Sequence, residues 1–377
     1  MPLSGPSVPP ATGEHPSALD ACIADAVRTA GGWLPFDRFM ELALYAPGLG
    51  YYTRDARQFG HGPGDGSDFV TAPELSPLFG QVLAQQLAEA LQATGTDELW
   101  EFGAGSGALA AQVLDELARL GQPLRRYTIV DLSGTLRGRQ RARLAAHAPR
   151  VHWAERLPEA MRGVVLGNEV LDAMPVQLLA RTDGQWFERG VVPQDDGWAW
   201  SDRPTGLRPP VEIEGGHDLV TEIHPRAEAF VRTLGERLQR GGAGAAFFID
   251  YGFPEAEYYH PQRHMGTLVC HRAHRMDDDP LTDAGEKDIT AHVNFTGIAL
   301  AAQDVGLAVL GYTSQGRFLL NCGLAERLDS TSIPKGAAAM KLVTEHEMGE
   351  LFKVIGLAVG EGWNARGFAA GDRTHRL

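Results

Sequence analysis

The sequence has few cysteines and no long apolar run. Its three cysteines, Cys22, Cys270 and Cys322, are scattered and free of Cys-x-x-Cys spacing, which argues against disulfides and against a zinc site. We therefore expect a reducing, cytoplasmic location and no bound metal. The chain has no apolar run of about 18 residues, and no basic stretch followed by an apolar one opens it, so we expect neither a membrane span nor a signal peptide.

The chain also lacks an excess of positive charge. It has 34 lysines and arginines against 48 aspartates and glutamates, so its formal net charge is −14. Phosphate backbones are bound by clustered basic residues, and a nucleic-acid partner is therefore not expected. An acidic enzyme more readily attracts a basic substrate. With 377 residues and 44% hydrophobic content, the chain is long enough to bury a large core.

A glycine-rich turn is the most informative motif. The residues Glu-Phe-Gly-Ala-Gly-Ser-Gly at 101–107 lie between an apolar strand end and a helical pattern from 108 to 120. Glycine there lets a ligand lie against bare backbone. Dinucleotide enzymes use the spacing G-x-G-x-x-G, whereas this chain has G-x-G-x-G, the spacing of class I S-adenosyl-L-methionine (SAM) methyltransferases. Glu101 would then meet the ammonium of the ligand, and the alternative is a purely structural turn.

A second acid follows at the distance that a βαβ unit requires. Residues 126–131 have the pattern of a strand that ends in Asp131, the position at which a carboxylate grips a ribose. We therefore expect Asp131 to be the ribose ligand. The alternative is that it caps a helix that begins near Ser133, since aspartate and serine both favour such positions.

Strand-length apolar segments recur along the chain, with helical patterns between most of them. This alternation predicts an α/β fold, with a seven-stranded, doubly wound, Rossmann-like sheet of the class I methyltransferase type. The seven strands are expected near residues 98–102, 126–131, 151–153, 164–168, 245–250, 307–311 and 352–359.

Three long segments interrupt this alternation. Residues 176–223 contain short alternating apolar runs and turn pairs, which predict β-hairpins, and residues 251–293 and 316–345 are polar and turn-rich. We expect β-rich insertions here, gathered near the carboxyl ends of the strands, where ligands bind in such sheets. The expected domains are a helical N-terminal segment with a lid at 1–95 and a methyltransferase core at 96–377.

Two acids follow the fourth expected strand. An apolar run leads into Asn168 and Glu169, and Asp172 comes three residues later. Methyl transfer depends mainly on the positioning of the reactants, and carboxylates here would orient a cationic acceptor and take its proton. The alternative is that Asp172 caps a helix, while Glu169 binds the cofactor or a neighbouring arginine.

Six blocks of this chain carry a resemblance to a known family: residues 44–52, 68–74, 101–107, 167–176, 288–295 and 315–320. They resemble the MidA-like methyltransferase family, which includes the mitochondrial complex I assembly-factor methyltransferase. The resemblance implies a SAM-dependent methyltransferase that yields S-adenosyl-L-homocysteine (SAH). For the mitochondrial relative it implies symmetric dimethylation of an arginine in a respiratory complex I subunit, so a protein substrate is expected, with a respiratory complex subunit as the first candidate.

The blocks also define a candidate site. Phe69, Thr71 and Glu74 either form a lid over the cofactor or seat the N-terminal segment on the sheet. His292 is either a proton acceptor or a structural histidine. The expected cofactor-binding residues are Phe69, Thr71, Pro73, Glu101, Gly103, Gly105, Gly107, Asp131, Leu132, Asn168 and Glu169, and the expected catalytic residues are Glu169, Asp172 and His292.

The chain departs from the family at two of these positions. Asp131 stands where glutamate is more common, which keeps the ribose-binding charge and shortens its reach. Asn294 stands where aspartate is common, which puts arginine specificity in question if that acid holds the substrate guanidinium or a catalytic histidine. The first expectation is methylation of a nitrogen, that of an arginine, in a partner protein. Two alternatives stay open: methylation of a small metabolite, and SAM binding by an assembly or chaperone protein without turnover.

Overall fold

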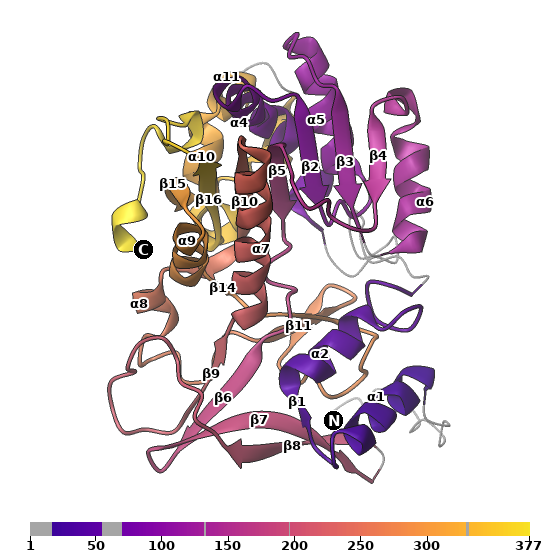
Figure 1. Ribbon diagram of the computed structural model, residues 1–377, viewed down its shortest axis with the longest axis vertical. Coiled ribbons are helices and arrows are strands. Elements are labelled where there is room, and N and C mark those ends of the chain that lie inside the picture. Colours follow the sequence, from indigo (N-terminus) through magenta and orange to yellow (C-terminus); the bar gives the residue numbers. More distant parts are fainter. Residues whose placement is uncertain (1–16, 55–69, 132, 196, 329–331) are drawn as a thin grey trace, which may run out of the picture.

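A computed structural model describes residues 17–54, 70–131, 133–195, 197–328 and 332–377. Figure 1 shows a large sheet with helices on both faces at one end of the molecule, and a second sheet with the N-terminal helices at the other. Within the described ranges, no helix is long and apolar enough to cross a membrane.

The large sheet contains the seven strands that the sequence predicts. Their order is β15 (Leu307–Ser314), β16 (Phe352–Val359), β10 (Gly244–Phe253), β5 (Gly163–Asn168), β2 (Glu98–Phe102), β3 (Arg126–Val130) and β4 (Val151–Ala154). β16 runs antiparallel to both of its neighbours, and the other adjacent pairs along the main path are parallel. A short further strand, β14 (Val293–Asn294), pairs with the end of β10, so the sheet has eight strands among the described residues rather than the seven expected.

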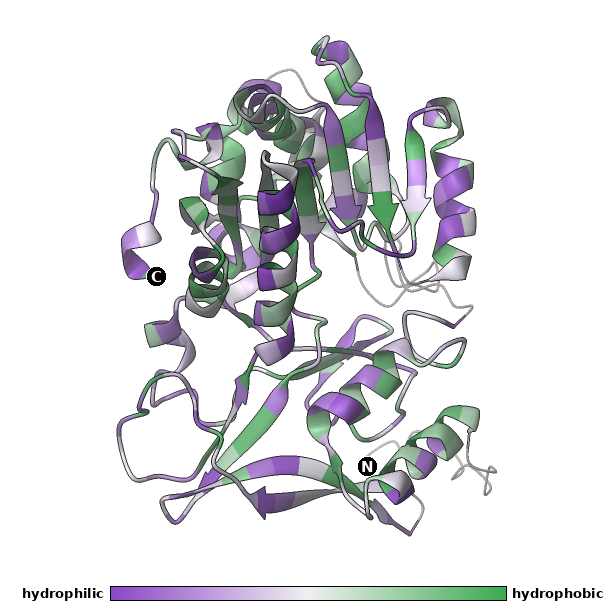
Figure 2. Ribbon diagram, in the orientation of Figure 1, coloured by the Kyte–Doolittle hydropathy of each residue, from purple (hydrophilic) through white to green (hydrophobic). Residues whose placement is uncertain are grey.

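Two hydrophobic cores lie on the two faces of this sheet. The helices that cover the sheet are α4 (Leu78–Thr94), α5 (Ala108–Arg119), α6 (Gly134–Arg143), α7 (Pro225–Gly241) and α9 (Phe295–Asp304). Successive residues of a strand point to opposite faces, so Phe247 packs in the core with α4 and α5, while Phe248 packs in the core with α7 and α9. Figure 2 shows the central strands as largely hydrophobic, whereas α7 alternates between hydrophobic and hydrophilic residues.

The second sheet comes mainly from the first insertion, and the β-hairpins expected at 176–223 are confirmed. The insertion supplies β6 (Gln177–Thr182), β7 (Gln185–Gln194), β8 (Gly197–Pro204) and β9 (Leu219–Ile223), and the N-terminal part supplies α1 (Ala18–Thr29), β1 (Leu34–Pro35) and α2 (Phe36–Tyr45). The N-terminal strand joins the inserted sheet, because β1 pairs antiparallel with β7. α1 and α2 share a hydrophobic core with this sheet and with part of the second insertion.

The other two insertions differ from each other. The second contains α8 (Glu255–Tyr258) and a small sheet of β11 (Val269–Arg272), β12 (Arg275–Asp277) and β13 (Asp288–Thr290). The third was expected to be β-rich, which is wrong. Its apolar residues pack on the face of the large sheet that α4 covers, and this burial favours helices there. These helices are α10 (Gln315–Asn321), α11 (Leu324–Leu328) and α12 (Ile333–Met340). The domain boundary near residue 95 remains a prediction.

Gly190 of β7 tests the junction between the N-terminal strand and the inserted sheet. A Cβ atom there would lie 2.4 Å from Trp33 Cε2 and 2.5 Å from the Leu34 carbonyl oxygen. We expect Gly190→Ala to lower the free energy of unfolding by about 1–3 kcal/mol, because the added methyl overpacks this contact. Gly197→Ala in β8 is the matched control, since no atom of the described residues lies within 4 Å of its Cβ position. Equal denaturant midpoints for the two variants would contradict this account.

Candidate active site

A cavity of about 430 Å³ lies at the carboxyl ends of β2, β3 and β5. This is where ligands bind in open α/β sheets. Most of the predicted site residues line it: Thr71, Pro73, Glu101, Gly103, Gly105, Asp131, Asn168, Glu169 and Asp172. Gly107 and His292 are not among the lining residues, and Phe69 and Leu132 lie outside the described residues.

The glycine turn has the backbone that its spacing predicts. Gly103, Gly105 and Gly107 have φ angles of 63°, 51° and 81°, in the left-handed region that favours glycine. Gly103 and Gly105 face the cavity, whereas Gly107 is the N-cap of α5, and a Cβ atom there would lie 3.5 Å from Gln140. Two of the three glycines are thus placed for a ligand, and the third starts the helix.

Glu101 is a buried carboxyl at the end of β2. It accepts a hydrogen bond from the Tyr127 hydroxyl at 2.7 Å. Burial raises the pKa of Glu101 to about 8; the Tyr127 hydrogen bond opposes this rise, and the charge of Asp131 adds to it. The carboxyl is therefore largely protonated at neutral pH until a cation comes beside it.

Asp131 is held by a network that the sequence did not reveal. Its carboxylate accepts hydrogen bonds from the Ser133 backbone N–H at 2.9 Å and from Gln140 Nε2 at 2.8 Å. The same Gln140 nitrogen donates to the Gly105 carbonyl at 2.9 Å, so Gln140 joins the carboxylate to the glycine turn. The cap of α6 is Ser133, whose hydroxyl accepts from the Leu136 N–H. Asp131 is thus not the cap, and it lines the cavity as expected for a ribose ligand.

The segment that begins at Thr71 lies against the glycine turn. It forms α3 (Ala72–Leu75), and the Pro73 carbonyl accepts a hydrogen bond from Gln112 Nε2 of α5 at 2.7 Å. Glu74 contacts the Ser106 hydroxyl and forms an ion pair with Arg143 at 2.9 Å. These contacts seat the segment on the large sheet, and its movement as a lid remains a prediction.

The turn after β5 aims Glu169 into the cavity. Glu169 has a φ angle of 55°, which is unusual for a residue other than glycine. Its carboxyl accepts from Asn168 Nδ2 at 2.9 Å and from the Ala72 N–H at the start of α3. Burial, with the charge of Asp172 next, raises the pKa of Glu169 to about 8. No helix follows Asp172, so the interpretation of this residue as a helix cap is excluded.

Two further aspartates, which the sequence analysis missed, lie near Asp172. Asp250, at the end of the expected fifth strand, accepts hydrogen bonds from the Val170 and Leu171 N–H groups at 3.0 and 2.8 Å. Asp288, from β13, lines the cavity and accepts from the Tyr52 hydroxyl at 2.7 Å. Each had a signal in the sequence: Asp250 ends a strand, as Asp131 does, and Asp288 opens one of the six family blocks.

His292 and Asn294, from the same block, lie elsewhere. The His292 ring stacks on Tyr251 with centroids 6.0 Å apart, and burial lowers its pKa to about 4. Asn294 is the N-cap of α9: its side-chain oxygen accepts from the Gly297 N–H at 3.2 Å. The departure from aspartate at Asn294 therefore affects a helix cap and leaves the cavity lining unchanged.

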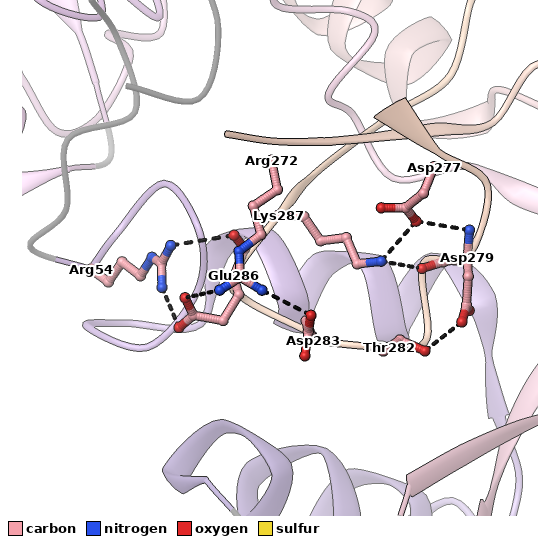
Figure 3. A network of polar contacts seen from close by, with 8 residues as sticks. All are labelled: Arg54, Arg272, Asp277, Asp279, Thr282, Asp283, Glu286 and Lys287. Carbon is pink, nitrogen blue, oxygen red and sulfur yellow. Dashed lines mark hydrogen bonds and ion pairs between the residues drawn. The ribbon is translucent and has the colours of Figure 1, made fainter. Parts of the chain in front are cut away.

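The residues next to Tyr52 and Asp288 in the chain take part in a network of ion pairs and hydrogen bonds, which Figure 3 shows. Arg54, two residues after Tyr52, pairs with Glu286, two residues before Asp288. Lys287 is buried and donates to Asp277 Oδ1 at 2.8 Å and to the Asp279 carbonyl at 2.6 Å. Both partners of the Tyr52–Asp288 hydrogen bond are thus anchored by neighbours in the chain.

The charges around the cavity are all of one sign. Five carboxyl groups line it, from Glu101, Asp131, Glu169, Asp172 and Asp288, and no lysine, arginine or histidine does so among the described residues. Asn168 Oδ1 is also buried and receives no hydrogen bond within the described ranges. Bare glycine backbone, carboxylates and a spare acceptor fit a ligand that carries an ammonium, a ribose and a sulfonium, as SAM does.

Comparisons with known proteins agree with this fit. The model of a family described as "Putative S-adenosyl-L-methionine-dependent methyltransferase" matches residues 82–313. A crystal structure from Burkholderia thailandensis, described as a "likely methyl transferase" bound to S-adenosyl-homocysteine, is 51% identical, covers 96% of each chain and has a TM-score of 0.90. The mitochondrial protein arginine methyltransferase NDUFAF7 of Danio rerio is 26% identical, over 86% of this chain and 83% of its own, and that of Homo sapiens is 28% identical, over 85% and 78%.

These findings confirm the resemblance seen in the sequence, together with the cofactor and the class of enzyme. They also correct one expectation. The cytoplasmic location inferred from the scattered cysteines is contradicted, because the curated relatives are named as mitochondrial proteins. Reduced cysteines describe the redox state of a compartment and do not identify it.

The pKa of Glu101 makes cofactor binding depend on pH. A ligand ammonium favours the ionised carboxyl, so SAH binding at neutral pH should release a proton from Glu101. Affinity should then increase as the pH rises from about 6 towards the pKa of about 8, and level off there. Calorimetry in two buffers of different ionisation enthalpy measures the proton release.

Two variants test whether Glu101 is the source of that proton. Glu101→Gln should abolish the release. Tyr127→Phe is the matched variant, because it removes the hydrogen bond that lowers the pKa of Glu101 and should move the pH dependence to higher pH. Proton release that persists unchanged in Glu101→Gln would assign it to another group.

Proposed function

Since the chain belongs to the family of S-adenosyl-L-methionine-dependent methyltransferases, we propose that it methylates a nitrogen of an arginine side chain in a partner protein. The observation that carries this proposal is the acid-only lining of the cavity. Glu101 and Asp131 flank the glycine turn, where they would hold the ammonium and the ribose of the cofactor. Glu169, Asp172 and Asp288 remain for a second cation.

A guanidinium suits these three carboxyls. It is planar, stays charged, and presents N–H donors that match carboxylates in pairs. Tyr45 and Tyr52 also line the cavity, and their rings stack with centroids 5.6 Å apart. Aromatic faces of this kind attract a cation. The names of the curated relatives, which are protein arginine methyltransferases, support the same choice.

The protein's share of the chemistry is positioning and proton handling. When bound, SAM supplies a methyl group on a positively charged sulfur. The carboxyls orient the acceptor so that a nitrogen lone pair points at this methyl group, and such alignment provides much of the rate. In its ionised form, Asp172 then takes the proton that the acceptor loses, as a general base does.

A labelling experiment tests the class of acceptor. The protein would be incubated with methyl-labelled SAM and a lysate of cells that lack it, and the products would be analysed by mass spectrometry. Label on an arginine of a protein is expected. Subunits of respiratory complexes are the first candidates, since the family resemblance points to them. Label in a small metabolite, or SAM binding without turnover, would refute the proposal in favour of one of the other two functions.

Asp172→Asn tests the proposed base. The amide keeps the size of the side chain and still donates a hydrogen bond to Asp250, so the fold and SAH affinity should persist. Turnover should fall by a factor of about 10²–10⁴, the usual range for a positioned acid or base. Glu169→Gln is the comparison, and it should also weaken cofactor binding, because Glu169 bonds to Asn168 and to the Ala72 N–H. Full methyl transfer by Asp172→Asn would leave these acids only a structural role.

A further inference from the structure

Asp250 lies within β10, is buried and does not line the cavity. Its carboxylate accepts hydrogen bonds from two successive backbone N–H groups, those of Val170 and Leu171. The adjacent Glu169 N–H donates to the Ile249 carbonyl at 2.9 Å. Ile249 and Asp250 of β10 thus hold the turn after β5 at three points, where Glu169 has its left-handed backbone.

Asp250 also contacts Asp172 directly. Asp172 Oδ1 and Asp250 Oδ1 are both buried and receive no hydrogen bond from any other described group. The two carboxyls hydrogen-bond to each other, which requires a proton on one of them. Two carboxylates so close together do not ionise together readily, so the pair retains one proton at neutral pH.

We infer that Asp250 is a positioning residue for methyl transfer, which acts through Asp172 by sharing a single proton with it and by fixing the turn that aims Glu169. This inference rests on the proposed function for its link to catalysis. The negative charge of Asp250 has two effects: it binds the backbone N–H groups that fix the turn, and it raises the pH at which Asp172 ionises.

The surroundings of Asp172 favour its protonated form. Burial is the largest cause that raises the pKa of Asp172 well above its usual range. The charges of Asp250 and Asp288, and the hydrogen bond with Asp250, raise this pKa further. Burial likewise raises the pKa of Asp250 to about 7. The other titratable groups that interact electrostatically with Asp172 are Glu169, Tyr45, Tyr52 and Tyr251.

Asp250→Asn separates the two effects of Asp250. The amide oxygen can still accept from the Val170 and Leu171 N–H groups, so the turn and SAH affinity should survive. The amide nitrogen donates to Asp172, and the negative charge is gone, and both changes favour the ionised form of Asp172. The acidic limb of the pH profile of kcat should therefore move to lower pH by about 1–3 units.

Glu222→Gln is the matched control. Glu222 is buried in β9, outside the cavity, and also accepts from two successive backbone N–H groups, those of Thr267 and Leu268, at 2.8 and 3.1 Å. A loss of packing alone would act alike in both variants. The inference predicts that the limb moves in Asp250→Asn and stays in Glu222→Gln. It is overturned if the limb stays in both variants or moves equally in both.

Infrared spectroscopy tests the shared proton without any acceptor. At neutral pH the shared proton should contribute a carbonyl stretch of a buried carboxylic acid, in addition to those of Glu101 and Glu169, whose pKa values are about 8. Difference spectra between the wild type and each of Asp172→Asn and Asp250→Asn should show the loss of the same single band, because either change leaves a single carboxylate with an amide donor. The inference is overturned if Asp250→Asn loses no such band. If the wild type methylates no arginine, the proposed function fails, and this comparison still decides whether the proton is shared.

Discussion

The structure depends on one electrostatic constraint: five carboxyls face a single cavity with no basic side chain among the described residues that line it. A carboxylate taken out of water is costly unless it is paired. Protons satisfy part of this need in the free protein, which is why burial raises the pKa values of Glu101 and Glu169 to about 8. A cationic ligand pairs with the carboxylates more favourably than protons do. The buried carboxyls therefore favour the binding of cationic ligands.

The acids come from distant parts of the chain, and the architecture explains how they meet. The parallel strands β2, β3 and β5 present Glu101, Asp131 and Glu169 at one edge, as their common direction requires. Asp288 arrives from the second insertion, and its partner Tyr52 from the N-terminal segment. The hydrophobic core shared by these two parts, together with the ion pairs of Figure 3, brings them to the same corner. The inserted elements therefore complete the site.

The sequence predicted what is encoded locally. The strands of the large sheet follow from apolar runs, and Glu101, Asp131 and Glu169 follow from their position at strand ends, which a parallel sheet must gather. The hairpins of the first insertion follow from alternation and turn pairs. Each of these predictions depends on residues that are close together in the sequence, and none depends on contacts between distant segments.

The missed features depend on contacts between distant segments. Gln140 has no motif of its own and matters because α6 places it against both Asp131 and the glycine turn. In the block at 288–295, the sequence analysis favoured His292 because a histidine can accept a proton. In the structure, His292 stacks on Tyr251, and Asp288 is the residue that lines the cavity. The helices of the third insertion were missed because their apolar face is recognisable only against the sheet that buries it.

The same charge pattern selects against wrong ligands. A dinucleotide would bring its pyrophosphate to the glycine turn, where Glu101 is the neighbouring side chain and no basic residue lines the cavity among those described. The pattern also suits the course of methyl transfer, in which the sulfur loses its positive charge while the acceptor loses a proton. A carboxylate whose pKa is raised can keep that proton and become a neutral acid. The loss of the positive charge on sulfur is then matched by the loss of one negative charge, and the net charge in the cavity does not change.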